Sequence, residues 1–129
     1  MKWLKILTPL LALHLIAWIA SHIYFTNNRQ EVLLVVDTSY SMKEKSGRVL
    51  QWIDHYEVSD RYKSVTIGTD KALLGKLTDL SSKDVIFRTS FGKLTNDNLL
   101  RLYSNIDADT RILLSDGSLR PQDWELITF

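Results

Sequence analysis

The sequence lacks cysteine, which excludes disulfides, thiolate metal sites and thiol nucleophiles and is compatible with either side of a membrane. It also lacks an excess of charge of one sign. The formal net charge is +1, so no basic field favours nucleic acid as a partner. We find no internal repeat and no low-complexity segment. The 129 residues predict one domain, and an apolar content of 45% is that of an ordinary folded chain.

Charged side chains are also missing from a long stretch near the N-terminus. Residues 6–25 contain no Asp, Glu, Lys or Arg. Twenty helical residues span about 30 Å, the hydrocarbon thickness of a bilayer. Trp3 at one end, and Tyr24 with Phe25 at the other, are placed as interfacial aromatic residues would be. We therefore predict four regions: an N-terminal segment, a transmembrane helix, a polar linker and a folded domain, over residues 1–5, 6–25, 26–30 and 31–129.

The charges that flank this stretch predict its orientation. Lys2 and Lys5 precede it and only Arg29 follows closely, so the positive-inside rule places the N-terminus in the cytoplasm and the domain across the membrane. The alternative is a cleaved signal peptide, whose apolar core is usually about 7–15 residues long and ends in small residues. Here the run is longer, and we favour an uncleaved anchor. His14 and His22 lie inside the span, and we assign them no role.

After residue 30, apolar runs alternate with amphipathic stretches. The run "EVLLVVD" is continuously apolar up to its aspartate, which is typical of a strand covered on both faces. The predicted elements, in chain order, are strand 31–37, a helix within 43–60, strand 62–69, a short edge strand within 70–77, helix 95–106, strand 111–117 and strand 124–129. Val85 to Phe87 fit a strand or a loop. This order predicts a Rossmann-like α/β domain, with a mostly parallel sheet and helices on both faces.

Two of the predicted strands end in an aspartate, Asp37 and Asp116. Ligands of open α/β sheets bind beyond the carboxyl ends of the strands, so neighbouring strands would bring both carboxylates to one crevice. Ser39 and Ser41 follow Asp37 at alternate positions and can point the same way. Thr95 begins the second predicted helix. The sequence therefore predicts a cluster of oxygen atoms at one edge of the sheet.

This set of side chains predicts a metal site of a particular kind. Its members offer only oxygen: Asp37, Ser39, Ser41, Thr95 and Asp116. Oxygen ligands suit Mg²⁺, with Mn²⁺ or Ca²⁺ as alternatives, and not zinc. Because three of the five are neutral hydroxyls, a bound ion could accept one more carboxylate from outside. We therefore expect a protein partner that supplies an acidic residue. Thr89 and Ser90 are alternative sources of the hydroxyl assigned to Thr95.

The motifs resemble those of a known family. "DTSYSM" resembles the D-x-S-x-S metal-ion-dependent adhesion site (MIDAS) of von Willebrand factor type A (VWA) domains, and "ILLSDG" resembles their "TDG" strand end. "LTNDNLLRL" is similar to the loop and helix that supply the site's threonine. The resemblance covers roughly residues 31–118 and implies a Mg²⁺ site and protein binding without catalysis. Behind an anchor, it looks most like bacterial Bat-type members, which implies the inner membrane and an extracytoplasmic VWA-like domain.

Two features depart from the family pattern. Tyr40 lies between the two serines, where the family often has glycine. Only thirteen residues follow Asp116, whereas family members usually continue with further strand–helix units. The domain is therefore expected to be a minimal version, a truncated gene product or one completed by a partner.

Two other functions are compatible with the sequence. One is a VWA-like scaffold or assembly subunit that has lost its metal. The other is a phosphatase of the haloacid dehalogenase class, with Asp37 as nucleophile. That class usually carries a second Asp two residues on, where this chain has Ser39. We therefore expect no enzymatic activity.

Overall fold

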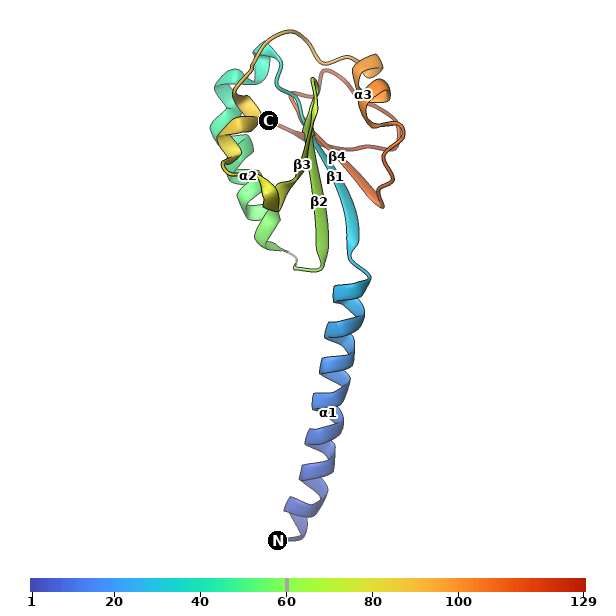
Figure 1. Ribbon diagram of the computed structural model, residues 1–129. Coiled ribbons are helices and arrows are strands. Elements are labelled where there is room, and N and C mark those ends of the chain that lie inside the picture. The colour runs from blue at the N-terminus through green and yellow to red at the C-terminus, as the bar shows by residue number, and fades with distance from the viewer. Residues whose placement is uncertain (60) are drawn as a thin grey trace.

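The computed structural model describes residues 1–59 and 61–129, which form a long N-terminal helix and an α/β domain (Figure 1). Helix α1 (Lys2–Asn27) extends away from the domain, and none of its residues is buried. By length and composition it could cross a membrane, a test that a signal sequence also passes. It contains the predicted span 6–25. The predicted linker 26–30 shrinks to two residues, because the helix runs to Asn27 and the first strand begins at Gln30.

A five-stranded sheet forms the centre of the domain, in the order β3-β2-β1-β4-β5. The strands are β1 (Gln30–Val36), β2 (Lys63–Thr69), β3 (Leu73–Lys76), β4 (Thr110–Ser115) and β5 (Glu125–Thr128). All neighbours are parallel except β2 and β3, which form an antiparallel hairpin. In β1 the last five of its seven residues are buried, as its apolar sequence predicted. The prediction of an α/β domain with a mostly parallel sheet is confirmed.

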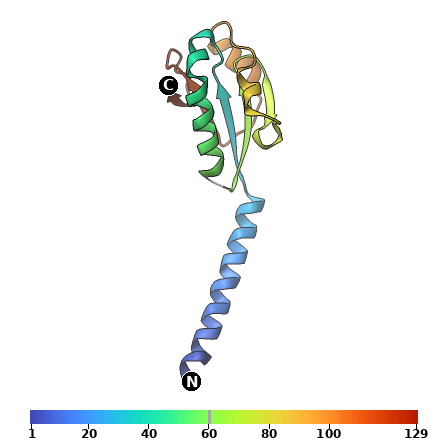
Figure 2. The same cartoon turned by 90° about the vertical axis from the view of Figure 1, so that its left-hand side faces the viewer.

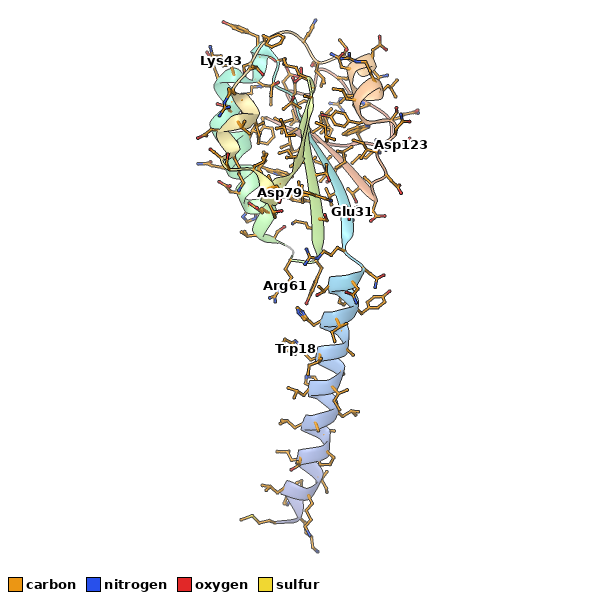
Figure 3. The ribbon with its side chains drawn as sticks, in the orientation of Figure 1. Trp18, Glu31, Lys43, Arg61, Asp79 and Asp123 are labelled. Carbon is orange, nitrogen blue, oxygen red and sulfur yellow. The ribbon has the colours of Figure 1, made fainter. Side chains whose placement is uncertain are left out.

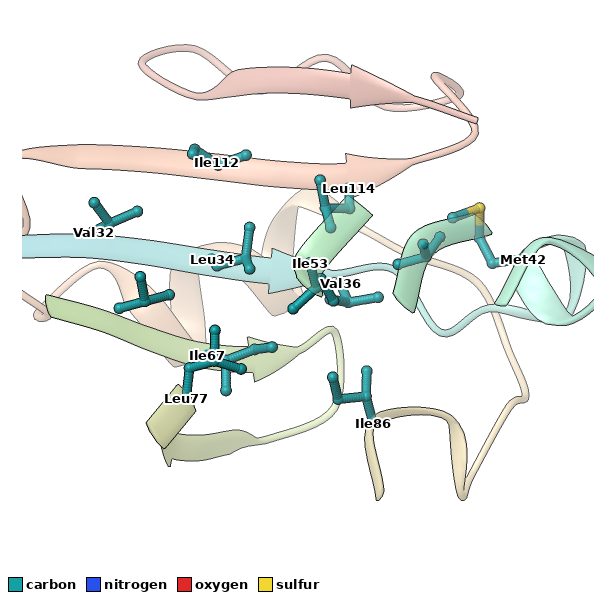
Figure 4. Close-up of a cluster of buried hydrophobic side chains, with 12 residues drawn as sticks. Val32, Leu34, Val36, Met42, Ile53, Ile67, Leu77, Ile86, Ile112 and Leu114 are labelled. Carbon is teal, nitrogen blue, oxygen red and sulfur yellow. The ribbon is translucent and has the colours of Figure 1, made fainter. Parts of the chain in front are cut away.

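Helices cover both faces of this sheet (Figure 2). Alternate residues of β1 point to opposite faces. On one face, helix α2 (Ser46–Ser59) contributes Val49 and Ile53 to the cluster drawn in Figure 4. The strand residues of that cluster are Val32, Leu34, Val36, Val65, Ile67, Ile112 and Leu114. The sheet is therefore the middle of three layers.

The opposite face is covered by helix α3 (Asn96–Tyr103). Leu99 and Tyr103 of this helix pack with Leu33, Val35 and Leu113 of the sheet. The predicted helix 95–106 is thus confirmed in type but ends three residues earlier than expected. Asp60, at the end of the stretch 43–60 that predicted α2, lies outside the described residues.

Three short 3₁₀ helices complete the domain: η1 (Tyr40–Lys45), η2 (Leu77–Asp79) and η3 (Lys83–Phe87). Val85 to Phe87, for which a strand or a loop was predicted, belong to η3. Ser82 caps this helix by accepting a hydrogen bond from the Asp84 amide. Ile86 is buried in the same cluster as α2, so tertiary packing selects the helical turn.

The end of α1 contacts Tyr62, the residue before β2. The Nδ1 atom of His22 lies 2.8 Å from the Tyr62 hydroxyl oxygen, and the Phe25 and Tyr62 rings lie 5.4 Å apart. His22, to which the sequence assigned no role, is thus part of the junction with the domain. β1 begins three residues after α1 ends and runs away from it (Figure 1). Figure 3 shows Lys43 at the end of the domain far from α1, whereas Arg61 lies near that helix.

Candidate functional site

The structure places Asp37 and Asp116 at the ends of adjacent parallel strands. Asp37 follows β1 and Asp116 follows β4, and these two strands pair directly. The Asp37 amide donates a hydrogen bond of 2.8 Å to the Leu114 carbonyl, which continues the ladder beyond β1. Because both strands are parallel, their carboxyl ends meet at one edge of the sheet, away from α1. The predicted crevice required the two strands to be neighbours, and they are.

A continuous chain of hydrogen bonds joins four of the five predicted residues. The Ser39 amide donates to Asp37 Oδ1 over 2.8 Å. The hydroxyl oxygens of Ser39 and Ser41 lie 3.1 Å apart, and the Ser41 hydroxyl donates to Asp116 Oδ2 over 2.8 Å. The two predicted strand ends are therefore linked through the two serines. The links are made by the carboxylate and hydroxyl oxygens of these residues and by the Ser39 amide.

Asp37 has one carboxylate oxygen without a partner. The residue is 1% exposed, and its Oδ2 atom is buried and accepts no hydrogen bond from the described residues. Burial raises the pKa of Asp37, the hydrogen bonds from Ser39 oppose that effect, and the charges of Asp70 and Asp116 add to it. A buried carboxylate oxygen without a partner is costly, because it loses its hydration without gaining a compensating cation or donor. A positive charge placed beside Asp37 would therefore stabilise the site.

The pKa of Asp116 is shifted in the opposite direction to that of Asp37. The hydrogen bonds of Ser118 hold its pKa below the usual range, and the Ser41 hydroxyl and the Lys45 charge act in the same direction. The Ser118 amide donates to Asp116 Oδ1 over 3.0 Å. Gly117 makes this turn with a φ of +85°, a conformation that favours glycine. Asp116 is therefore a stable anion at the rim of the site, whereas Asp37 is the buried carboxylate at its base.

Thr95 lies outside this chain of hydrogen bonds. Its side chain is the N-cap of α3 and accepts a hydrogen bond of 3.3 Å from the Asn98 amide. In the described part of the chain, no hydrogen bond joins Thr95 to the other four predicted residues. The loop before it is nevertheless tied to the Asp37 loop, since the Phe91 amide donates to the Thr38 carbonyl over 3.1 Å.

Ser90 lies in that loop and has a hydroxyl oxygen that can still accept a hydrogen bond or bind a cation. Its Oγ atom is buried and has no partner among the described residues. Like Asp37 Oδ2, it is a buried oxygen that a cation or a water could satisfy. Ser90, the alternative that the sequence offered, therefore has an unsatisfied hydroxyl, whereas the Thr95 hydroxyl is already used as a helix cap.

A second buried carboxylate, which was not predicted as part of the site, lies beside it. Asp70, at the start of the stretch 70–77 that predicted an edge strand, is 2% exposed, and its Oδ1 accepts hydrogen bonds from the amide and hydroxyl of Thr38 over 3.0 and 2.6 Å. The Lys71 ammonium lies 2.9 Å from Asp70 Oδ2 and 3.1 Å from the Thr38 carbonyl oxygen. One signal was available: Asp70 also follows a strand of the parallel set, β2, which pairs with β1. These residues fix the backbone between Asp37 and Ser39.

Two hollows open at the site, and Ser41 belongs to the lining of both. The first, of about 360 Å³, is lined by residues of all the site's loops: Ser39, Ser41, Gly92, Lys93, Leu94, Asp116 and Ser118. The second, of about 530 Å³, is lined by Tyr40, Ser41, Lys43 and Glu44. A larger hollow of about 560 Å³ lies between α3 and residues 119–124 and contains none of the predicted site residues. The candidate site is thus accessible from the end of the domain opposite α1.

Comparison with known proteins does not assign the chain to a family. A scan against protein-family models found no match, and searches of curated proteins and of solved structures found no significant match either. Within residues 1–59 and 61–129, no three His, Asp or Glu side chains gather as a metal-binding group. The predicted set, which combines two carboxylates with hydroxyls, is not such a group. The VWA resemblance therefore depends on the sequence motifs alone.

Proposed function

We propose that the chain is a membrane-anchored, VWA-like module that binds a protein partner through a divalent metal ion. The observation that carries this proposal is the buried, unpartnered Oδ2 of Asp37 beside the linked oxygens of Ser39, Ser41 and Asp116. Mg²⁺ fits this set, because it is a hard cation that prefers oxygen. A cation at Asp37 would also remove the cost of burying the carboxylate.

The residues have distinct roles in this proposal. Asp37 and Asp116 would supply charge, Ser39 and Ser41 neutral oxygens, and Ser90 or Thr95 the third loop. When bound, the ion would supply a positive centre that accepts one carboxylate oxygen of a partner. Two carboxylates balance the charge of a divalent ion within the chain. The attraction for a further carboxylate would then depend on open coordination positions and on the lysines nearby.

The position of the site relative to α1 supports a protein partner. The seven residues of β1 cover about 23 Å at roughly 3.3 Å each, and the site lies beyond them. With α1 in a bilayer, the site would face away from the membrane surface, out of reach of lipid headgroups. By the positive-inside rule we place the N-terminus in the cytoplasm and the domain on the outer side of a bacterial inner membrane. The partner would then be an extracytoplasmic protein surface.

One observation favours a second candidate, a scaffold subunit without metal. The Ser41 hydroxyl already donates to Asp116, so the oxygen cluster is partly satisfied by itself. In that case the fold would present its surfaces to a partner and Asp37 would be a remnant. The enzyme alternative has less support, since Ser39, at the position of the second Asp of that phosphatase class, is hydrogen-bonded to Ser41.

The test is metal binding by the full chain in detergent micelles. We expect Mn²⁺ to bind, as followed by its electron paramagnetic resonance signal, and Mg²⁺ to raise the melting temperature relative to EDTA. Binding at 100 times Kd adds about 2.7 kcal/mol to the free energy of unfolding, or roughly 10–20 °C for a domain of this size. Asp37→Ala should abolish both effects. Asp107→Ala, at an exposed aspartate before β4 and so at the opposite end of that strand from Asp116, is the matched control and should change neither.

The same assay distinguishes the remaining alternatives. Ser90→Ala should weaken Mn²⁺ binding, whereas Thr95→Ala should lower stability by about 1 kcal/mol through loss of the helix cap and leave Mn²⁺ affinity unchanged. The reverse pattern would assign the third loop to Thr95. No Mn²⁺ binding by the parent chain would refute the metal site and favour the scaffold. Turnover of a generic phosphoester that Asp37→Ala abolishes would instead show an enzyme.

A further inference from the structure

Two exposed aromatic side chains flank the candidate site. Tyr40 is 75% exposed and Phe91 is 60% exposed, although large apolar side chains of a folded domain are mostly covered. Tyr40 lies between the two serines of the motif, and Phe91 lies in the third loop next to Ser90. These two rings are therefore presented to solvent at the place where the proposed metal would meet a partner.

Hydrogen bonds hold the backbone of both aromatic residues, and a lysine contacts one of the rings. The Tyr40 amide donates to the Gly92 carbonyl over 3.3 Å, and the Phe91 amide donates to the Thr38 carbonyl over 3.1 Å, so the two loops are tied together. The Lys71 ammonium lies 4.6 Å from the centre of the Phe91 ring and is itself paired with Asp70. An aromatic side chain on an ordered loop loses little conformational entropy on binding, which makes it an effective contact residue.

The hollows show which parts of a partner could fit. The hollow beside Asp116 is lined by site oxygens and would receive the partner's carboxylate. The second hollow, beside Tyr40, shares Ser41 with the first and would receive a neighbouring side chain. A single extended segment could occupy both, because they adjoin across one residue.

The charges around the site define the partner further. The lysines that line or contact it are Lys43, Lys45, Lys71 and Lys93, and the carboxylates are Asp37, Glu44, Asp70 and Asp116. These charges balance, so a divalent ion would leave the face positive. Such a face attracts acidic segments and repels basic ones.

We propose that Tyr40 and Phe91 form an aromatic rim that selects the partner. The segment it selects is acidic, and an apolar or aromatic side chain lies next to the carboxylate that meets the ion. This inference rests on the proposed metal site and specifies the ligand of that site. Tyr40 then has a function at the position where the family often has glycine.

The test is a peptide selection on the full chain in nanodiscs. The probe is a multivalent phage-displayed library with a fixed central Asp and randomised flanking positions, selected in Mg²⁺ and in EDTA. In Mg²⁺ we expect enrichment of an apolar or aromatic residue beside the Asp, together with further acidic residues. Synthetic peptides from the selection should bind about tenfold more weakly to Tyr40→Ser or Phe91→Ser. Tyr24→Ser, at an exposed aromatic residue of α1, is the control and should leave their affinity unchanged.

Several outcomes would overturn the inference. Enriched peptides that need the Asp and Mg²⁺ but show no apolar preference would refute the rim and leave the metal site standing. A parent chain that binds no Mn²⁺ in the same nanodiscs would refute both proposals. If Tyr40→Ser changed the oligomeric state and left the selected peptides unchanged, the rim would contact a second copy of the chain.

Discussion

Replacing Gly68 with alanine should destabilise the domain through one buried tyrosine. A Cβ atom at Gly68 would lie 2.2 Å from the Tyr103 hydroxyl oxygen and 2.9 Å from two ring carbons. Tyr103 is fully buried, and its hydroxyl donates to the carbonyl oxygens of Thr69 and Ala72. Forcing an extra methyl into such a core costs about 1–3 kcal/mol, and each lost hydrogen bond about 1 kcal/mol. We expect a total of about 3 kcal/mol.

The measurement is thermal unfolding of the full chain in micelles, followed by near-UV circular dichroism. A loss of about 3 kcal/mol corresponds to a melting temperature lower by roughly 10 °C or more. Gly47→Ala is the matched control: nothing lies within 4 Å of its Cβ position, and the residue is in α2. That control should be neutral or stabilising by up to about 1 kcal/mol, because alanine favours the helix.

A second substitution tests whether Tyr103 is the cause. Tyr103→Phe removes the closest atom, so Gly68→Ala should cost at least about 1 kcal/mol less in the Phe background than in the parent. The two ring carbons at 2.9 Å would still be crowded, so recovery should be partial. Equal costs in both backgrounds, or no cost in the parent, would show that the Tyr103 ring does not pass over Gly68.

Three further changes probe the site and the core. Burial raises the pKa of Asp37 above its ordinary 3.8, so the folded state binds this proton more tightly than the unfolded state. In EDTA, Asp37→Asn should therefore be more stable than the parent at neutral pH, and this advantage should shrink as pH falls towards 4; urea titrations across pH measure it, and equal stabilities at neutral pH would contradict it. Lys71→Met leaves the Asp70 carboxylate without its cation and should cost about 3 kcal/mol, most of which Asp70→Asn should restore in a double-variant cycle. Ile53→Ala removes a fully buried side chain of α2 and should cost about 2–5 kcal/mol in the same titration, whereas a cost under 1 kcal/mol would indicate that α2 does not pack on the sheet.

The strands could be predicted because their apolar patterns indicate how many of their faces are buried. "EVLLVV" has no polar position after its first residue, and only a central strand of a covered sheet buries both faces in this way. Val85 to Phe87 form a shorter apolar run, and nothing local separates a strand from a helical turn there. Ile86 is buried beneath α2 and the sheet, so contacts distant in sequence decide the outcome. The end of α3 was predicted wrongly for a similar reason. Ile106 lies in the loop after the helix, yet it packs against the same apolar cluster as Leu99 and Tyr103 of α3.

The candidate site could be predicted where strand order alone places a residue. Asp37 and Asp116 need only two neighbouring parallel strands, whereas a hydroxyl at a helix start, such as Thr95, looks the same whether it caps the helix or binds a ligand.

The role of Asp70 depends on side-chain geometry that no motif records. Its carboxylate accepts hydrogen bonds from the amide and hydroxyl of Thr38, and the Lys71 ammonium donates to the Thr38 carbonyl. The backbone that leads to Ser39 is therefore held by contacts within the chain that involve none of the atoms proposed to bind the ion. A cation at Asp37 would meet a loop already ordered, so the proposed metal affinity would not be reduced by the cost of ordering it.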